Sequence, residues 1–456
     1  MNYTAFILIL LTLQIVCLFV GGRSSKELKT QDDYFLAGKG IRFFPLMMTF
    51  LATQVGGGLV LGSAEEAFHF GWSVLLYPLG CVLGLILLGL GIGRRFAQFQ
   101  VSTVAQILEV IYGSPVLKKI ASLLSITTLF LIFVAQIVGS NKFMLSLGID
   151  STVWFVLFWG IVIFYTAMGG LKAVVATDVI QATFFIAAFL LSFGYVLYSS
   201  PLPFSSILEA GLNQESFTLE SSKLCGWLLM PLLFMVIEQD MGQRCFAADS
   251  PRTVSKATLC AAACTLVISI IPIFFGILAK SSGVVVPQGA SVLMVAMVQI
   301  TNPLITALVG CAILAAIIST ADSLINAIGS NLSQDFGFTS LNRNIRIAQV
   351  MSAGIALVGI FVSFFFDNIV DLLIQSYELS VSCLFIPIFF GLFKKRGNAL
   401  SAALAIGCGA ACFIIFKLVP THFPREILSV IGSLSGYCLG EVASWERKDA
   451  VRTSLD

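Results

Sequence analysis

Long apolar stretches alternate with short polar loops over almost the whole chain. Each apolar stretch holds about 20 residues, the length that an α-helix needs to cross a bilayer. Strand-length segments of alternating polarity are absent, so the pattern predicts an all-α membrane protein, a helix bundle rather than an outer-membrane barrel. About thirteen transmembrane helices are predicted, at residues 2–21, 43–64, 70–93, 120–140, 152–168, 174–198, 224–242, 257–279, 303–330, 347–366, 369–393, 399–416 and 426–442.

The composition supports this prediction. Hydrophobic residues make up 58% of the chain and charged residues 11%, with a mean hydropathy of +0.97, whereas soluble domains carry about 25% charged residues. The eleven cysteines fall mostly inside spans and form no CxxC pair, so we interpret them as small packing residues. No phosphate-binding loop or nucleophile–base pair is evident, so we expect neither ATP-driven pumping nor enzyme activity, and no nucleic-acid partner.

Basic residues in alternate loops indicate the orientation in the lipid bilayer. With the N-terminus outside, the inner loops and the C-terminal tail hold 21 of the 26 Lys and Arg residues, and the outer loops hold five. Cytoplasmic loops retain Lys and Arg, so we expect a multi-pass protein of the cytoplasmic (inner) membrane with a cytoplasmic C-terminus. A cleaved signal peptide at 2–21 is the alternative, and it would leave twelve spans with the same inner and outer loops.

A polar stripe runs through the apolar helix predicted at 303–330. From Ser319 the spacing i, i+3, i+4, i+7 places four polar side chains on one helical face. An Asp at mid-bilayer costs about 2.5–3.5 kcal/mol on insertion scales, so Asp322 requires a partner, a cavity or a cation. The stripe consists of Ala316, Ser319, Thr320, Asp322, Ser323 and Asn326.

The second span is interrupted by glycine. Each Gly costs a helix about 1 kcal/mol relative to Ala, so three in a row favour local unwinding, with close helix packing as the alternative. Glu65 and Glu66 follow this span and are expected at the outer mouth. The polar and small residues of the span are Thr49, Thr53, Gln54, Gly56, Gly57, Gly58, Gly62 and Ser63.

The seventh span ends in a second polar, glycine-containing break at 238–244. The two breaks stand five spans apart, an odd offset that reverses direction through the membrane, as expected for the first helices of inverted repeats. Secondary transporters place their sites at such paired broken helices. Glu238 and Asp240 either face the permeation path or lie at the membrane surface, and we interpret Arg244 as an inner-loop anchor.

Asp178 lies early in the sixth span and supplies a further carboxylate. It either caps its helix near the inner surface or points inward beside Ser319, Asp322 and Ser323. An inward position would create the oxygen-rich pocket that a hard monovalent cation requires, and protons could use the same carboxylates. Glu378 in the eleventh span is also intramembrane, and its sequence context indicates no partner.

Four runs, in order along the chain, resemble the sodium:solute symporter family. They are DDYFLAGKGI before the second span, the GG…TDVIQA run at 169–182, EQDMGQRCFAADSPR at 238–252 and AAIISTADSLINA at 315–327. The resemblance implies a LeuT-type fold with a 5+5 inverted repeat of helices. Its parts would be a leading transmembrane helix and inner loop (1–42), a first five-helix repeat (43–198), a second inverted repeat (224–393), and two trailing helices with a short cytoplasmic tail (394–456).

The resemblance also implies Na+ as the coupling ion. In the family a sodium site joins the first and eighth core helices, and the matching positions here are the carbonyls of Ala52, Val55 and Ala316 and the hydroxyls of Ser319 and Thr320. The spacing of the last three agrees with the stripe that the residues themselves indicate.

A second sodium or proton site would use Asp178, Asp322 and Ser323. Carriers similar to proline carriers have an acidic residue where this chain has Gln54, so no motif selects among amino acids, sugars, carboxylates, vitamins and urea. The candidate substrate-binding residues at the two breaks are Thr53, Gln54, Gly56, Gly57, Glu238 and Gln239.

The resulting hypothesis is a sodium-coupled symporter that imports a small organic solute by alternating access. One alternative is a proton-coupled carrier on the same fold, in which Asp178 or Asp322 would titrate. The other is a solute sensor that binds without transporting.

Overall fold

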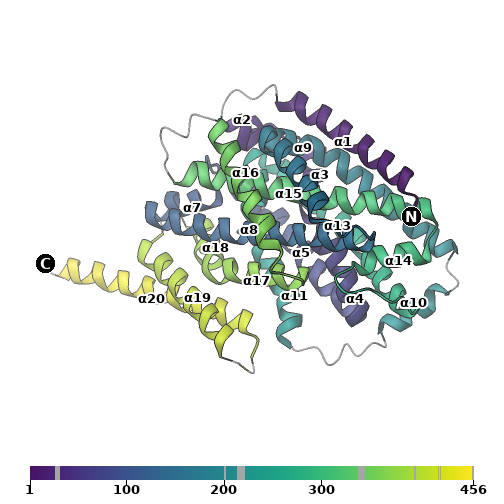
Figure 1. Ribbon diagram of the computed structural model, residues 1–456. Coiled ribbons are helices and arrows are strands. Elements are labelled where there is room, and N and C mark those ends of the chain that lie inside the picture. Colours follow the sequence, from purple (N-terminus) through teal and green to yellow (C-terminus); the bar gives the residue numbers. More distant parts are fainter. Residues whose placement is uncertain are drawn as a thin grey trace.

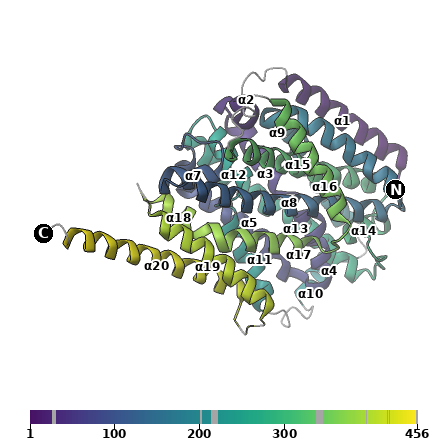
Figure 2. The same cartoon turned by 60° about the vertical axis from the view of Figure 1, so that its left-hand side comes forward.

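The computed structural model describes residues 1–25, 31–199, 202–212, 221–336, 345–394, 397–419, 421 and 423–453. These residues form a helix bundle, and the strand-type pairing among them is limited to one parallel bridge between Ile41 and Ala248. The N-terminal helix lies along one edge of the bundle, and the last two helices extend from the other side (Figures 1 and 2). The predicted all-α class is confirmed. The predicted loops at 199–223 and 331–346 lie partly outside the described residues.

The helix bounds follow the predicted spans closely in several places. In chain order the helices are α1 (Tyr3–Ser25), α2 (Gln31–Leu36), α3 (Phe43–Gln54), α4 (Ser63–Phe70), α5 (Leu76–Leu87), α6 (Gly93–Phe96), α7 (Val104–Tyr112), α8 (Pro115–Ser146), α9 (Thr152–Ser199), α10 (Phe204–Leu212), α11 (Ser221–Phe234), α12 (Gln239–Ala247), α13 (Pro251–Ser281), α14 (Val292–Ile300), α15 (Pro303–Asp335), α16 (Ile345–Ser363), α17 (Ile369–Ser380), α18 (Ile386–Leu392), α19 (Ala399–Leu418) and α20 (Arg425–Thr453). Tighter turns form η1 (Ala37–Lys39) and η3 (Gly71–Leu75), and π-helical turns form η2 (Gly58–Gly62), η4 (Leu88–Ile92) and η6 (Val381–Phe385).

Ten helical segments of the described chain are long and apolar enough to cross a membrane. Three shorter apolar helices, Phe43–Gln54, Thr152–Ile163 and Ala353–Ser363, coincide with the other predicted spans. The predicted spans 152–168 and 174–198 correspond to the two helical arms of α9, which is interrupted by non-helical backbone at Gly170 (φ 60°, ψ −177°). The count of thirteen spans therefore stays a prediction.

Three long helices begin with the same N-terminal capping motif. Ser114, Ser250 and Asn302 each accept a hydrogen bond from a backbone amide of the first turn, and a proline follows each of them. Such a cap contributes about 1 kcal/mol, and proline at the first helical position has no amide proton to leave unpaired. The starts of α8, α13 and α15 are thus determined by short sequence motifs.

Helix α15 lies at the centre of the bundle and packs against α1, α3, α8, α9, α12 and α16. Nearly all of its side chains after the first turn are buried. The outer helices instead expose large apolar side chains such as Phe19 on α1 and Leu439 on α20, as expected for surfaces that face lipid. The polar stripe of α15 therefore lies in the protein interior.

Candidate functional site

At the break after α3 the backbone approaches neighbouring helices too closely to leave room for a side chain. Val55, the residue that ends α3, leaves the helical region with φ −86° and ψ 70° and is buried. A Cβ on Gly56 would lie 2.5 Å from the Thr320 hydroxyl oxygen and 2.8 Å from the Gln136 amide oxygen. The backbone amide of Gly57 donates to that same Gln136 oxygen at 2.7 Å. Glycine therefore brings this backbone directly against α15 and α8.

Two hydroxyls of α15 face the carbonyl end of α3. The Ser319 hydroxyl lies 3.2 Å from the Ala52 carbonyl and 3.0 Å from the Ala316 carbonyl. The Thr320 hydroxyl lies 3.2 Å from the carbonyls of Ala52 and Thr53 and 3.1 Å from that of Ala316. Carbonyls in the last turn of a helix lack intrahelical partners, so hydroxyl and carbonyl oxygens converge here. Such neutral oxygens can replace the hydration shell of a small hard cation.

Arg244 is fully buried and pairs with Asp178, so its interpretation as an inner-loop anchor is wrong. Its guanidinium reaches the Asp178 carboxylate at 3.5 Å, the Ser323 hydroxyl at 2.6 Å and the Thr49 hydroxyl at 2.9 Å. The Thr49 hydroxyl in turn donates to Asp178 at 2.5 Å. The loop count assigned Arg244 to a surface because positional counting has no access to a partner 66 residues earlier in the chain.

The other polar residues of the stripe contact different elements. Asp322 accepts a short hydrogen bond from the Thr166 hydroxyl on α9. The Gln243 amide donates to the Asn326 amide oxygen at 3.0 Å and to the Phe35 carbonyl at 2.5 Å. Of the residues predicted as a second cation site, Asp178 and Ser323 thus contact Arg244, and Asp322 contacts Thr166.

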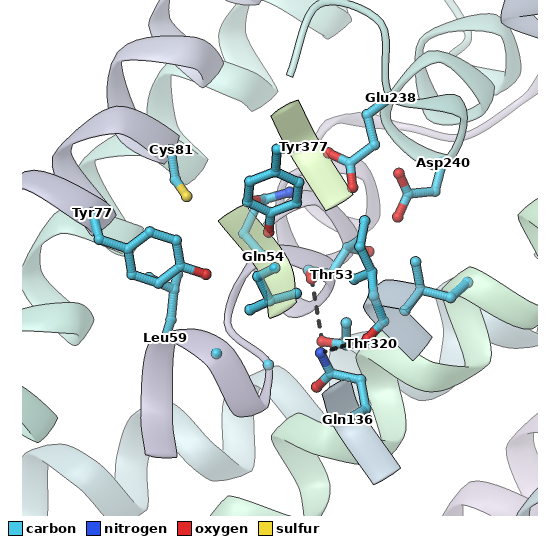
Figure 3. Close-up of a pocket in the computed structure, with 15 residues that line it drawn as sticks. Thr53, Gln54, Leu59, Tyr77, Cys81, Gln136, Glu238, Asp240, Thr320 and Tyr377 are labelled. Atoms are coloured by element: carbon cyan, nitrogen blue, oxygen red, sulfur yellow. Dashed lines mark hydrogen bonds between the residues drawn. The ribbon is translucent and has the colours of Figure 1, made fainter. Parts of the chain in front are cut away.

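A small cavity lies where the two breaks meet (Figure 3). Its volume is about 20 Å³, little more than one water molecule needs. The carboxylates of Glu238 and Asp240 occupy one side of it, and the rings of Tyr77 and Tyr377 lie nearby. The lining residues are Thr53, Gln54, Gly56, Gly58, Leu59, Tyr77, Cys81, Ile132, Gln136, Glu238, Asp240, Thr320, Leu324, Leu373 and Tyr377.

Two of the predicted substrate-binding residues lie outside this lining. The Gln239 side chain points toward α7, where its amide oxygen accepts from the backbone amide of Val104 at 2.7 Å and its amide group donates to the Ser102 carbonyl at 3.3 Å. Gly57 is held by Gln136 from the other side of the break. Both residues shape the breaks without contributing to the cavity wall.

Three acidic residues outside this cavity form ion pairs with basic residues that the loop count places outside. Glu65 and Glu66, expected at the outer mouth, lie in the first turn of α4, and Glu378 lies in α17. Their pairing is consistent with a common outer side. The pairs are Lys142–Glu65 at 2.6 Å, Lys223–Glu66 at 3.0 Å and Arg425–Glu378 at 3.6 Å.

Several residues of the site were not singled out from the sequence. Gln136 is a buried amide in the apolar helix α8, and a lone amide within a membrane span is a signal that could have identified it. Thr166 has the same kind of signal only weakly, because threonine is common in apolar helices. Tyr77 and Tyr377 carry no local signal, since tyrosine suits a packed membrane helix equally well.

Comparisons with known proteins agree with this geometry. The model of the sodium:solute symporter family matches residues 34–409. A sodium/sialic acid symporter of Proteus mirabilis is 24% identical over 96% of this chain and 94% of its own length, and a sodium/proline symporter of Haemophilus influenzae is 26% identical over 90% and 88%. The solved outward-open, substrate-bound structure of a Na+-coupled sialic acid symporter superposes with a TM-score of 0.79 at 19% identity, covering 96% of both chains.

Proposed function

Because the chain belongs to the sodium:solute symporter family, we propose that it imports a small organic solute together with sodium by alternating access. The observation that carries this proposal is the pair of α15 hydroxyls against the carbonyl end of α3. Sodium-coupled solute symport and a LeuT-like fold follow from the family and from the structural match. The ion ligands, the solute site and the transport cycle are the parts proposed here.

Sodium would be held by the carbonyls of Ala52, Val55 and Ala316 and the hydroxyls of Ser319 and Thr320. On binding, the ion would replace the hydroxyl protons as the partner of the carbonyl oxygens. Its positive charge would then hold α3 and α15 together. A conformation in which these two helices lie together would gain that binding energy, and one that separates them would lose it. Each ion entering the cell contributes about 2.3 kcal/mol per 100 mV of membrane potential.

The solute would bind between the breaks, against Thr53, Gln54, Gly56 and Glu238. These residues line the cavity, which must widen to admit an organic molecule because it is barely larger than a water molecule. Thr53 belongs to both regions, since its carbonyl lies at the Thr320 hydroxyl and its side chain meets Ser323 at 3.1 Å. Occupation of one site would therefore alter the other through a single shared residue.

Arg244 supports a single proposed sodium site. A guanidinium between Asp178 and Ser323 already supplies the positive charge that a second ion would bring. The proton-coupled alternative would need Asp178 to exchange its arginine for a proton during the cycle, or Asp322, which is bonded to Thr166, to titrate. The two halves 43–198 and 224–393 would move relative to each other, with the N-terminus outside and the C-terminus in the cytoplasm.

Sodium binding can be tested before the solute is known. We expect purified, reconstituted protein to melt at a higher temperature in sodium than in potassium, because an ion that binds the folded state stabilises it. Thr320→Ala and Ser319→Ala should weaken the apparent sodium affinity about tenfold or more, because each removes one ligand to a charged group.

The matched controls are Thr127→Ala and Ser435→Ala, whose hydroxyls are exposed and bond only their own helices. Both should retain the full sodium effect. Equal melting temperatures in sodium and potassium, with a pH-dependent shift in their place, would favour the proton-coupled carrier. Unchanged sodium affinity in both α15 variants would contradict the proposed ligand set.

A further inference from the structure

Two carboxylates in the central cavity have oxygens without a hydrogen-bond partner. Glu238 is 5% exposed and Asp240 is fully buried, and both line the cavity. Neither Glu238 Oε2 nor Asp240 Oδ2 has a partner in the described chain. Buried carboxylates are costly unless paired. These two acids lie within hydrogen-bonding reach of each other, so the pair requires either a shared proton or a cation from outside the protein.

The neighbouring arginine forms no side-chain ion pair with these acids, although its charge acts on both of them. Arg244 directs its guanidinium to Asp178, Ser323 and Thr49, and it reaches Asp240 only through the backbone carbonyl, at 3.0 Å. Every charged side chain in the cavity lining is acidic: no lysine, arginine or histidine of the described chain belongs to it. The cavity lining therefore holds an acid pair and no basic side chain of its own.

The helix ends at the cavity also favour a cation over an anion. α3 ends at Gln54 and α11 ends at Phe234, immediately before the break that carries Glu238, and the carboxyl end of a helix is electronegative. The opposite end of α12 could attract an anion, but Asp240 uses its other oxygen to accept from the Met241 backbone amide at 2.9 Å. An anionic solute would find no basic side chain in the lining, and the Met241 amide is already bonded to Asp240.

The remaining walls suit a carbon skeleton. Leu59, Leu324 and Leu373 contribute apolar surface. The Tyr377 ring lies beside Glu238, and Tyr77 lies on the side away from the acids (Figure 3). Aromatic faces attract cations, including those whose charge is shielded by methyl groups. A bare metal ion would gain nothing from these walls, whereas an organic cation would contact both kinds of surface.

We propose that the transported solute is an organic cation, an ammonium or guanidinium compound whose positive group binds Glu238 and Asp240. This inference rests on the proposed function, since it identifies the solute class of the same central site. The solute would supply the positive charge that the cavity lining lacks, and Arg244 would stay paired with Asp178 throughout. Binding would thereby favour cations over carboxylates and neutral sugars by charge before shape is considered.

The test uses small organic probes of similar size that differ in charge. Melting temperatures of the purified, reconstituted full chain are measured in sodium and in potassium with n-butylammonium, butyrate or butyramide at equal concentrations, and with tetramethylammonium and methylguanidinium. We expect at least one cation to raise the melting temperature in sodium, and butyrate and butyramide to have no effect. Stabilisation by butyrate or butyramide, or by none of the cations while sodium alone still stabilises, would overturn the inference and leave sodium coupling intact.

Isosteric variants locate the cation. Glu238→Gln and Asp240→Asn should each weaken cation binding about 10- to 100-fold, the range for losing a charged hydrogen bond, and retain stabilisation by sodium alone. Glu209→Gln and Asp150→Asn are matched exposed controls and should bind as the unmodified chain does. Undiminished cation binding in both cavity variants would overturn the assignment.

The two proposals fail in different ways. If Glu238→Gln removes sodium stabilisation as completely as Thr320→Ala does, and no organic cation binds, the acid pair is an inorganic ion site and the inference is overturned. If a cation stabilises equally in sodium and potassium, the cation site is supported and sodium coupling fails.

Discussion

Both breaks around the central cavity interrupt a helix, but one is lined by neutral groups and the other by charged side chains. The break after α3 is neutral, and its carbonyls face the hydroxyls of α15 at about hydrogen-bond distance. The break between α11 and α12 ends at Glu238, and the first two turns of α12 add Asp240 and Arg244. The arginine forms an ion pair with Asp178, whereas no described basic side chain forms one with either acid. Neutral oxygens bind a cation weakly enough for it to be released, which suits the transported sodium ion. The acid pair carries negative charge, which suits a positively charged solute.

The largest effect is expected from removing the one paired charge of the second break. Arg244→Met leaves the Asp178 carboxylate buried without its cation, and breaking a buried pair from one side costs about 3–5 kcal/mol. We expect a marked fall in melting temperature and in the yield of monodisperse protein. The double variant Asp178→Asn/Arg244→Met should recover most of the loss, because it removes both charges.

The matched control is Arg252→Met, since Arg252 is exposed at the start of α13. That variant should melt as the unmodified chain does. If Arg244→Met is no less stable than Arg252→Met, the second break does not depend on its ion pair, and the contrast between the breaks is lost.

A smaller effect is expected at the first break from a single methyl group. In Gly56→Ala the added carbon would meet the Thr320 hydroxyl at 2.5 Å, so α3 and α15 must separate at the proposed ion ligands. Overpacking of this kind costs about 1–3 kcal/mol, and sodium affinity should fall at least about tenfold. Melting curves over a sodium titration measure both quantities.

Gly194→Ala is the control for this substitution, because open space surrounds Gly194 within helix α9. It should be neutral or slightly stabilising, as alanine is the better helix former. Sodium affinity that is unchanged in Gly56→Ala would show that the close approach of these helices is not required for the ion.

The smallest effect is expected from a carboxylate away from both breaks. Glu441→Gln removes the ion pair with Lys394, whose two side chains are 38% and 35% exposed. Exposed pairs contribute about 0–1 kcal/mol and are screened by salt. The melting temperature should therefore change little, and any change should shrink at high salt.

This variant provides the baseline for Glu238→Gln, which makes the same chemical change inside the cavity. A fall in melting temperature as large as that of Arg244→Met would show that Glu441 is structurally as important as the buried pair. The comparison of cavity and surface carboxylates would then carry no information about the solute.

Much of the site was predictable because its signals are local. Helical spacing placed Ser319 and Asp322 on one face, and the glycine run placed a break in the second span, where the structure ends α3 at Gln54. Family membership, shown by the match over residues 34–409, agrees with the resemblance found in the sequence runs. The same local information predicted Gln239 as a cavity residue, yet its amide is directed to Val104 on α7.

By itself the sequence determined the membrane class, most of the long helices, the break after α3 and the polar face of α15. These follow from composition, periodicity and helix propensity, which depend on neighbours along the chain. The second break, predicted at 238–244, instead lies before Gln239, because 239–247 forms α12. Only the tertiary structure decided that Arg244 pairs with Asp178 and that Glu238 and Asp240 face the cavity without a cation. Charge pairing in a buried site depends on distance in space, and the residues that compete for one arginine come from segments far apart in the chain.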